Sequence, residues 1–294
     1  MYVIKTRIFW YALSLVLLVG SLISVGVFGM KLGIDFTGGS ILSLRFQNRP
    51  SNADIERVIA KDDTGGIVIQ PVGEKDMNIR MQAVGEDAHQ RVLADIKSAY
   101  NGTEELSFNS IGPTIGAELR GKSLEALLIS FAAILLYIAY SFRGVSGPVQ
   151  NWKYGIVTLV AALHDAILPI GIFSILGRFA GFEVDTTFVV AILTILGYSI
   201  NDTIVVLDRV RENLRRTSGS FDQIVGASLK QTYVRSINTS MATLLALVAI
   251  FFFGGSTLKP FSLALIIGLI SGTYSSIFIA SPLLVTWQKW NKKK

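Results

Sequence analysis

The side chains with the clearest chemical potential are two carboxylates that lie deep inside apolar stretches of the sequence. Asp165 follows His164 in the middle of one stretch, and Asp202 follows Asn201 in the middle of the next. If these stretches cross a membrane, an ionised carboxylate there costs from about 2.5 to more than 10 kcal/mol, which makes both residues functional candidates. The alternative role is structural, because protonated acids also hydrogen-bond helices to one another in membrane bundles.

A cation lies at the edge of the following apolar stretch. Arg235, Thr239 and Thr243 are spaced four residues apart, which places them on one face of a helix. A nearby arginine favours the ionised form of a carboxylate, whereas desolvation favours the protonated form. A modest rearrangement around Asp202 or Asp165 could therefore switch its protonation, which is the chemistry of a proton relay. Arg235 is equally compatible with an interfacial role that orients its helix.

A short motif points to a different chemistry and is judged a false match. The segment Gly116 to Ser123 satisfies the phosphate-binding pattern G-x-x-x-x-G-K-S/T. That pattern works when its loop joins a buried strand to a soluble helix, with backbone N–H groups around the phosphate. Here the segment runs directly into an apolar stretch, and Lys122 is interpreted as a residue of the membrane interface. We therefore expect no nucleotide and no other cofactor, with protons as the coupling ion.

The composition is that of a membrane protein. The chain has 294 residues, of which 51% are apolar and 16% are charged, whereas soluble domains carry roughly 25% charge. It contains no cysteine, which excludes disulfides, thiol catalysis and cysteine-ligated metal sites. The two histidines, His89 and His164, remain as conventional metal or base candidates, and we expect no metal site.

The charged residues are unevenly distributed along the chain. Residues 31–122 hold 11 Lys and Arg against 13 Asp and Glu, a net charge of −2 and an ordinary soluble composition. The rest of the chain holds 16 Lys and Arg against 8 Asp and Glu, a net charge of +8. This contrast predicts one soluble insert within a membrane protein.

Six apolar stretches are long enough to cross a bilayer, which takes about 20 residues of helix. Their approximate bounds are 8–30, 123–142, 154–177, 186–207, 236–258 and 260–287. The first is interpreted as a retained anchor, because it exceeds the apolar core of a signal peptide and no cleavage motif follows. Around the short loops, fourteen basic residues lie on one side and two on the other, which favours cytoplasmic termini.

The predicted architecture is a polytopic α-helical membrane protein with six transmembrane helices in a one-plus-five arrangement. Residues 1–30 form the first helix, 31–122 an extracytoplasmic α+β domain, and 123–294 a five-helix transmembrane bundle with a cytoplasmic loop at 208–235. Apolar patterns in the insert predict the order βαββαβ, which is typical of a ferredoxin-like fold. Its strands are expected at 40–47, 67–72, 77–83 and 106–111, and its helices at 51–60 and 87–100.

Two further patterns concern helix packing. Ser220 to Gln223 resembles a capping box, and the apolar spacing from Phe221 to Leu229 predicts either an amphipathic helix on the inner membrane surface or a plain loop helix. Gly268, Gly272 and Ser276 are spaced four residues apart, so another helix could approach closely there. The sequence leaves open whether that neighbour belongs to this chain or to another subunit.

Several Gly-rich and polar motifs are spread over nearly the whole chain. They are Gly33 to Gly39, Gly112 to Leu119, Ala162 to Asp165, Gly197 to Asn213, Arg235 to Ser240 and Gly272 to Ser276. Together they resemble the SecF family of bacterial protein-export membrane proteins. That family pairs with SecD and belongs to the resistance–nodulation–division superfamily.

The resemblance implies that the proton motive force drives this chain, with SecD, to assist a preprotein leaving the SecY–SecE–SecG channel across the bacterial cytoplasmic membrane. By position, Asp202 matches the family's proton-coupling acid and Arg235 its partner arginine, while Asp165 is a weaker match. The supporting polar residues are expected to be His164, Asn201 and Thr239. The other membrane acid of the family belongs to SecD and is therefore not in this chain.

Two other function classes are compatible with the sequence. Two acids on adjacent spans could share a proton and activate water, as in an intramembrane aspartyl protease, but Ser199 to Asp202 lacks the Gly-x-Gly-Asp signature expected there. A small-molecule exporter of the same superfamily is disfavoured, because a single insert at 31–122 leaves little room for a ligand-binding cleft. We therefore expect a non-enzymatic export subunit that binds neither nucleic acid nor nucleotide.

Overall fold

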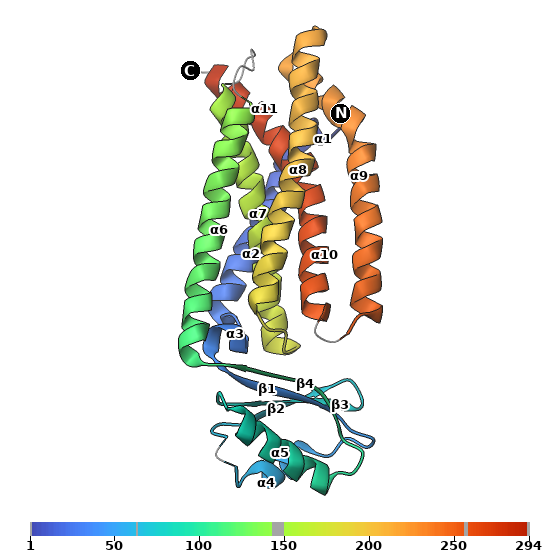
Figure 1. Cartoon of the computed structure of the whole chain (residues 1–294). Helices are drawn as coiled ribbons and strands as arrows, with labels where there is room; N and C mark the ends of the chain where they lie inside the picture. Colours follow the sequence, from blue (N-terminus) through green and yellow to red (C-terminus); the bar gives the residue numbers. More distant parts are fainter. Residues whose placement is uncertain (1, 63, 143–149, 256–257, 293–294) are drawn as a thin grey trace. The chain divides into compact units, whose positions relative to one another are not determined.

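The computed structural model describes residues 2–62, 64–142, 150–255 and 258–292, and the chain divides into two compact units. One unit comprises Met1–Lys31 together with Glu125–Lys294, and the other comprises Leu32–Leu124. The first unit is helical and the second is α+β (Figure 1).

The first unit is built of helices, most of them long. Their bounds are α1 (Tyr2–Lys5), α2 (Arg7–Phe28), α6 (Pro113–Ser141, which starts in the other unit), α7 (Asn151–Phe179), α8 (Thr186–Arg216), α9 (Phe221–Phe253), α10 (Leu258–Ser275), the π-helical turn η1 (Ser276–Ala280) and α11 (Ser281–Lys292). Among the described residues, six helical stretches are long and apolar enough to cross a membrane, as predicted. The last of these stretches, Leu258–Trp290, combines α10, η1 and α11.

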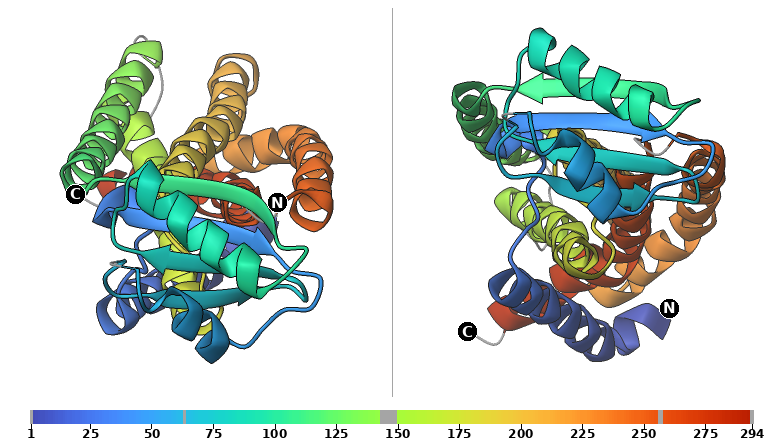
Figure 2. Two further views of the ribbon diagram at one scale, coloured as in Figure 1. Left: turned by 60° about the horizontal axis from the view of Figure 1, so that its bottom comes forward. Right: turned by 90° about the horizontal axis from the view of Figure 1, so that it is seen from below.

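Helices α7, α8 and α10 are the most buried of the bundle, and α2 packs along α7. Helices α6 and α9 are much more exposed and lie on opposite sides of the bundle (Figures 1 and 2). Small residues permit the close packing of α2 on α7. A Cβ added at Gly171 would lie 2.5 Å from the Cα of Ser21, and Ser24 Oγ donates to the Gly171 carbonyl at 2.8 Å.

The helix that contains the second predicted span, 123–142, is longer than that span. Helix α6 begins ten positions earlier in the chain, at Pro113, whose fixed φ suits the first position of a helix. The phosphate-binding pattern from Gly116 to Ser123 therefore lies inside a helix. The Gly116 N–H already donates to the Gly112 carbonyl at 3.0 Å, so this segment does not form the phosphate-binding loop of that motif.

The amphipathic segment after Ser220 is the first part of α9 rather than a separate helix. Its predicted capping box is present, with the Ser220 N–H donating to Gln223 Oε1 at 3.0 Å. The predicted apolar face is buried, and Asn213 of α8 donates to Ser228 Oγ at 2.8 Å. The prediction of a helix on the membrane surface is thus corrected, because protein neighbours cover that face.

The second unit contains a four-stranded antiparallel sheet in the order β2-β3-β1-β4, with two helices on one face (Figure 2). Its elements are α3 (Ile34–Thr37), β1 (Gly39–Arg45), α4 (Asn52–Ile59), β2 (Val68–Val72), β3 (Asp76–Met81), α5 (Glu86–Ala99) and β4 (Glu104–Ile111). This is the ferredoxin-like arrangement predicted from the sequence. The core lies between the sheet and the helices, where alternate residues of β1 and its end, Leu42, Leu44 and Phe46, are buried with Ile55 and Ile96.

Two Gly-rich motifs of the sequence pack against each other in this unit. Gly38 has φ +75°, and a Cβ there would lie 2.8 Å from the Cα of Pro113. A Cβ at Gly116 would lie 2.8 Å from the backbone nitrogen of Gly38. Only glycine fits such close backbone contacts without strain, so both motifs serve to join the start of β1 to the first turns of α6.

Candidate functional site

Asp165 lies in the middle of α7 and is fully buried. Its Oδ1 accepts from Ser271 Oγ at 2.6 Å and from His164 Nδ1 at 2.9 Å. Its Oδ2 accepts from Ser199 Oγ and from Ser275 Oγ, both at 2.5 Å. We call these four donors, which come from α7, α8 and α10, the Asp165 cradle. A carboxylate has about four acceptor positions, and the cradle fills them.

Close helix packing makes the cradle possible. The two α10 serines of the cradle are four residues apart and share one face of the helix. Between them, a Cβ added at Gly272 would lie 2.9 Å from the Cβ of Ser199 on α8. One turn earlier, a Cβ at Gly268 would meet the side chain of Ile195 at 2.2 Å. The small-residue stripe predicted from the sequence therefore packs within this chain, against α8.

Asp202 lies one turn beyond Ser199 on α8 and has different surroundings. Its Oδ2 accepts from Ser276 Oγ at 2.5 Å, and the residue is 7% exposed. It borders a cleft of about 350 Å³ between α8 and α9, which we call the α8–α9 cleft. The cleft is lined by Tyr198, Asn201, Asp202, Val205, Arg235, Ser236, Thr239, Ala242 and Thr243.

Arg235 enters the α8–α9 cleft from α9, together with the two threonines predicted to share its face. Its residue is exposed, and within the described part of the chain no carboxylate lies within 4.0 Å of its guanidinium. Thr239 Oγ1 donates to the Arg235 carbonyl at 3.0 Å, and Thr243 Oγ1 donates to the Thr239 carbonyl at 3.2 Å. The cleft thus brings together Asp202, Asn201 and Arg235. Within the described residues, Asp202 and Arg235 do not form an ion pair.

His164 and Asp165 are not among the residues that line the cleft. The His164 ring stacks on Tyr274 of α10, with ring centroids 5.9 Å apart. The Tyr274 hydroxyl bonds to Ser14 Oγ at 3.0 Å and to the Trp10 carbonyl at 3.1 Å, both in α2. His164 Nε2 is buried and has no hydrogen-bond partner among the described residues. Through Tyr274, the His164 ring connects the cradle with α2.

Comparison with known proteins identifies the family. The family model of the protein export membrane protein SecD/SecF, C-terminal, matches residues 91–290, and the model of the SecD/SecF GG motif matches residues 23–48. The protein translocase subunit SecF of Thermobaculum terrenum is 42% identical over 97% of this chain and 93% of its own length. The chain belongs to the SecF family. A second relative, the protein translocase subunit SecF of Synechocystis, is 38% identical over 89% of this chain and 84% of its own length.

Solved structures agree with the SecF family. The crystal structure of SecDF from Thermus, described as a translocon-associated membrane protein, has a TM-score of 0.84 and 32% identity over 97% of this chain. SecDF in its super-membrane-facing form has a TM-score of 0.69 over 99% of this chain. The chain spans 38% and 39% of those two longer proteins. As a SecF-family member, it is a multi-pass membrane protein and an accessory subunit of the Sec translocase.

Sequence reasoning missed the serines that hold both acids. Ser199, Ser271 and Ser275 donate to Asp165, but serine in a membrane helix equally signals close packing, so its type alone assigns no role. The available signal was the SecF-family motif from Gly272 to Ser276, which contains two of the donors.

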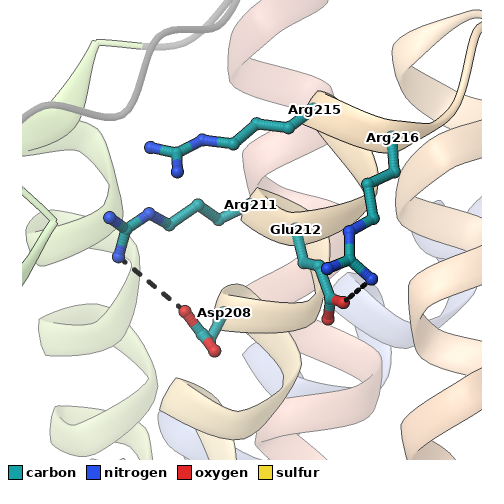
Figure 3. A pocket seen from close by; sticks show the side chains of 5 residues that line it. All are labelled: Asp208, Arg211, Glu212, Arg215 and Arg216. Atoms are coloured by element: carbon teal, nitrogen blue, oxygen red, sulfur yellow. Dashed lines mark ion pairs between the residues drawn. The ribbon is translucent and has the colours of Figure 1, made fainter.

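The C-terminal end of α8 carries charges of a different kind (Figure 3). Arg211 Nη1 lies 3.8 Å from Asp208 Oδ1, and Arg216 Nη1 lies 2.8 Å from Glu212 Oε1. The Arg215 side chain extends away from both acids. Exposed pairs of this type contribute at most about 1 kcal/mol to stability. Asp208 is therefore a suitable control acid for Asp202, because it lies on the same helix in a solvated setting.

Proposed function

We propose that this chain, together with SecD, uses the proton motive force to promote the movement and release of a preprotein from the SecY–SecE–SecG channel across the bacterial cytoplasmic membrane. The observation that carries the proposal is the shared α8–α9 cleft of Asp202 and Arg235 within membrane-spanning helices. The chain acts as a transport subunit rather than an enzyme, and it needs no nucleotide, metal or other cofactor.

Proton coupling follows from two competing partners of Asp202. When protonated, the carboxyl stays in its bond with Ser276 of η1. When ionised, it attracts Arg235 of α9, because an unpaired charge in surroundings of low dielectric is costly. Each proton that enters or leaves therefore changes the force between α8 and α9. The changed force shifts α8 relative to α9, and this shift is the step by which the extracytoplasmic α+β unit acts on the preprotein.

The exposed cleft supports SecD as the partner. Arg235, Asn201 and Thr239 are exposed on this chain, although polar and charged side chains facing lipid are unfavourable. A second membrane protein placed over α8 and α9 would cover them. The SecDF structures support this assignment, since this chain matches only part of each longer protein.

The test is Asp202→Asn in proteoliposomes that contain this chain, SecD, the SecY–SecE–SecG channel and a preprotein. We expect the stimulation of export by a proton gradient to fall by more than about tenfold, because asparagine cannot exchange the proton. Asp208→Asn on the same helix is the matched control and should retain the stimulation. Full stimulation in Asp202→Asn would show that this carboxyl does not couple protons to export.

The geometry does not favour the competing functions. An aspartyl protease needs two carboxylates around one water. Asp165 accepts from its cradle and Asp202 from Ser276, and the two acids share no donor among the described residues. A small-molecule exporter is not favoured either, because the named relatives are protein translocase subunits.

A further inference from the structure

Two consecutive serines hold two different acids. Ser275 Oγ donates to Asp165 Oδ2, and Ser276 Oγ donates to Asp202 Oδ2, each at 2.5 Å. Neighbouring residues on a helix point about 100° apart. The segment therefore faces α7 with one serine and α8 with the next, and a displacement of either serine moves the other.

The backbone changes its helix type at this point. Helix α10 ends at Ser275, and the π-helical turn η1 runs over Ser276–Ala280, with Ser281 Oγ donating to the Ser276 carbonyl at 3.3 Å. Such turns are rare and occur frequently at functional sites. Because a π-turn contains an extra residue, the position at which it starts decides which side chain faces Asp202.

The two acids also differ in access to a proton. The cradle fills the acceptor positions of Asp165, and the only titratable group within it is His164 on the same helix, since α8 and α10 contribute hydroxyls. Asp202 has one hydrogen-bond donor among the described residues, Ser276, and shares the cleft with Arg235 of α9 and Tyr198 of its own helix. A proton can reach Asp202 from the cleft, whereas at Asp165 it must displace a donor.

We propose that Asp165 is a positioning residue for Asp202 and exchanges no proton with the cleft. By accepting from Ser275, Asp165 fixes the start of the π-turn, and the π-turn presents Ser276 to Asp202. This mechanical role replaces the expectation that Asp165 carries a coupling proton. The inference rests on the proposed role of Asp202 in proton coupling.

Infrared difference spectra between high and low pH identify the carboxyl that takes up a proton. The variants are compared in the same complex with SecD, so that the contribution of SecD cancels. We expect the protonated-carboxyl band assigned to this chain to disappear in Asp202→Asn and to persist in Asp165→Asn. A band that is lost in Asp165→Asn and kept in Asp202→Asn would overturn the positioning role.

A milder variant keeps the test decisive if Asp165→Asn does not fold. Ser275→Ala removes one donor of the cradle and leaves both acids in place. We expect the midpoint pH of the Asp202 band to shift by about half a unit or more, because the position of Ser276 changes. The matched control is Ser262→Ala, a buried α10 serine whose hydroxyl, among the described residues, bonds only to carbonyls of its own helix, and it should leave the midpoint unchanged. An unchanged midpoint in Ser275→Ala would contradict the proposal.

A double-mutant comparison in the export assay tests whether Asp165 acts through Ser276. If it does, Asp165→Asn combined with Ser276→Ala loses no more proton-dependent stimulation than Ser276→Ala alone. Losses that multiply would mean an independent role for Asp165. If proton-dependent stimulation of export survives in Asp202→Asn, the proposed function fails. The infrared spectra would still show which of the two acids takes up the proton.

Discussion

Identical side chains acquire different chemistry in this bundle because their donors differ. Asp165 is surrounded by fixed hydroxyls on neighbouring helices, whereas Asp202 has one such donor in the described part of the chain and borders the α8–α9 cleft on its other side. On that side, Arg235 is the cation that can respond to a change of charge. The pair of Asp202 and Arg235 is therefore the part of the site in which a single substitution tests the coupling directly.

At this scale we predict that the charge and the shape of Arg235 both matter. Arg235→Gln should lower the proton-dependent stimulation of export by more than about tenfold, since nothing then offsets the ionised carboxylate. Arg235→Lys should retain part of it, because the charge remains while the planar fork of donors is lost. Reconstituted export is the measurement, and Arg215→Gln on the exposed end of α8 is the control (Figure 3). Equal activity of Arg235→Gln and wild type would rule out a role for this cation.

The charged residues of the site could be predicted from the sequence, and their partners could not. An acid or an arginine in an apolar run is conspicuous because its cost in a membrane is high. Ser275 and Ser276 carry no such signal, since their hydroxyls can bond to their own helix. Only the packing of three helices shows that these two serines serve different acids.

Close helix contacts in the bundle depend on a few glycines. Gly171 of α7 meets the backbone of Ser21 in α2, while Gly272 of α10 meets Ser199 in α8. Gly197, by contrast, has no atom within 4 Å of where its Cβ would be, although it also lies in a buried helix. Glycines of the same sequence type therefore have unequal importance for stability.

At the scale of elements we predict that Gly171→Ala is destabilising and Gly197→Ala is not. The added methyl at position 171 collides with backbone that cannot move aside, which should cost about 1–3 kcal/mol. At position 197 the methyl meets open space and improves helix propensity by up to about 1 kcal/mol. Thermal unfolding of the purified chain in detergent compares the two variants. An equal melting temperature for both would mean that α2 and α7 are not in close contact.

Element type was predictable, and element ends and irregular turns were not. Period-two and helical patterns place the four strands, α4 and α5 of the ferredoxin-like unit within two residues of their observed bounds, whereas the short helix α3 was not predicted. The apolar stretches begin at residues 123 and 236, whereas α6 and α9 begin at Pro113 and Phe221, because the first turns of both helices contain polar residues. The capping box at Ser220 predicted the start of α9, and no comparable signal was used for α6. The π-turn Ser276–Ala280 depends on a backbone hydrogen-bond register that residue types do not specify.

The whole molecule combines a slightly acidic insert with a basic membrane part, and the basic residues gather around one set of loops. Such asymmetry favours an orientation in which these loops face the cytoplasm. The absence of any cysteine makes the orientation directly measurable, because each introduced thiol is unique in the chain.

At this scale we predict opposite accessibility for two introduced cysteines. Ser98→Cys lies on an exposed face of α5, and Ser218→Cys lies in the exposed loop between α8 and α9. A membrane-impermeant maleimide added to intact cells should label the first and not the second. Labelling of both after the cells are opened is the control for reactivity. Selective labelling of Ser218→Cys in intact cells would show the opposite topology.

The Asp165 cradle also constrains how the protein is made. Asp165 lies on the third span, whereas Ser271 and Ser275 lie on the sixth. A chain inserted from its N-terminus therefore places this carboxylate in the membrane before half of its donors have been synthesised. Without these donors, an ionised Asp165 raises the free energy of membrane insertion by about 2.5 kcal/mol or more, and the apolar residues of α7 must offset this cost. The cradle is complete only when α10 is in place, so a chain that stops before Leu258 leaves Asp165 with two of its four donors, His164 and Ser199.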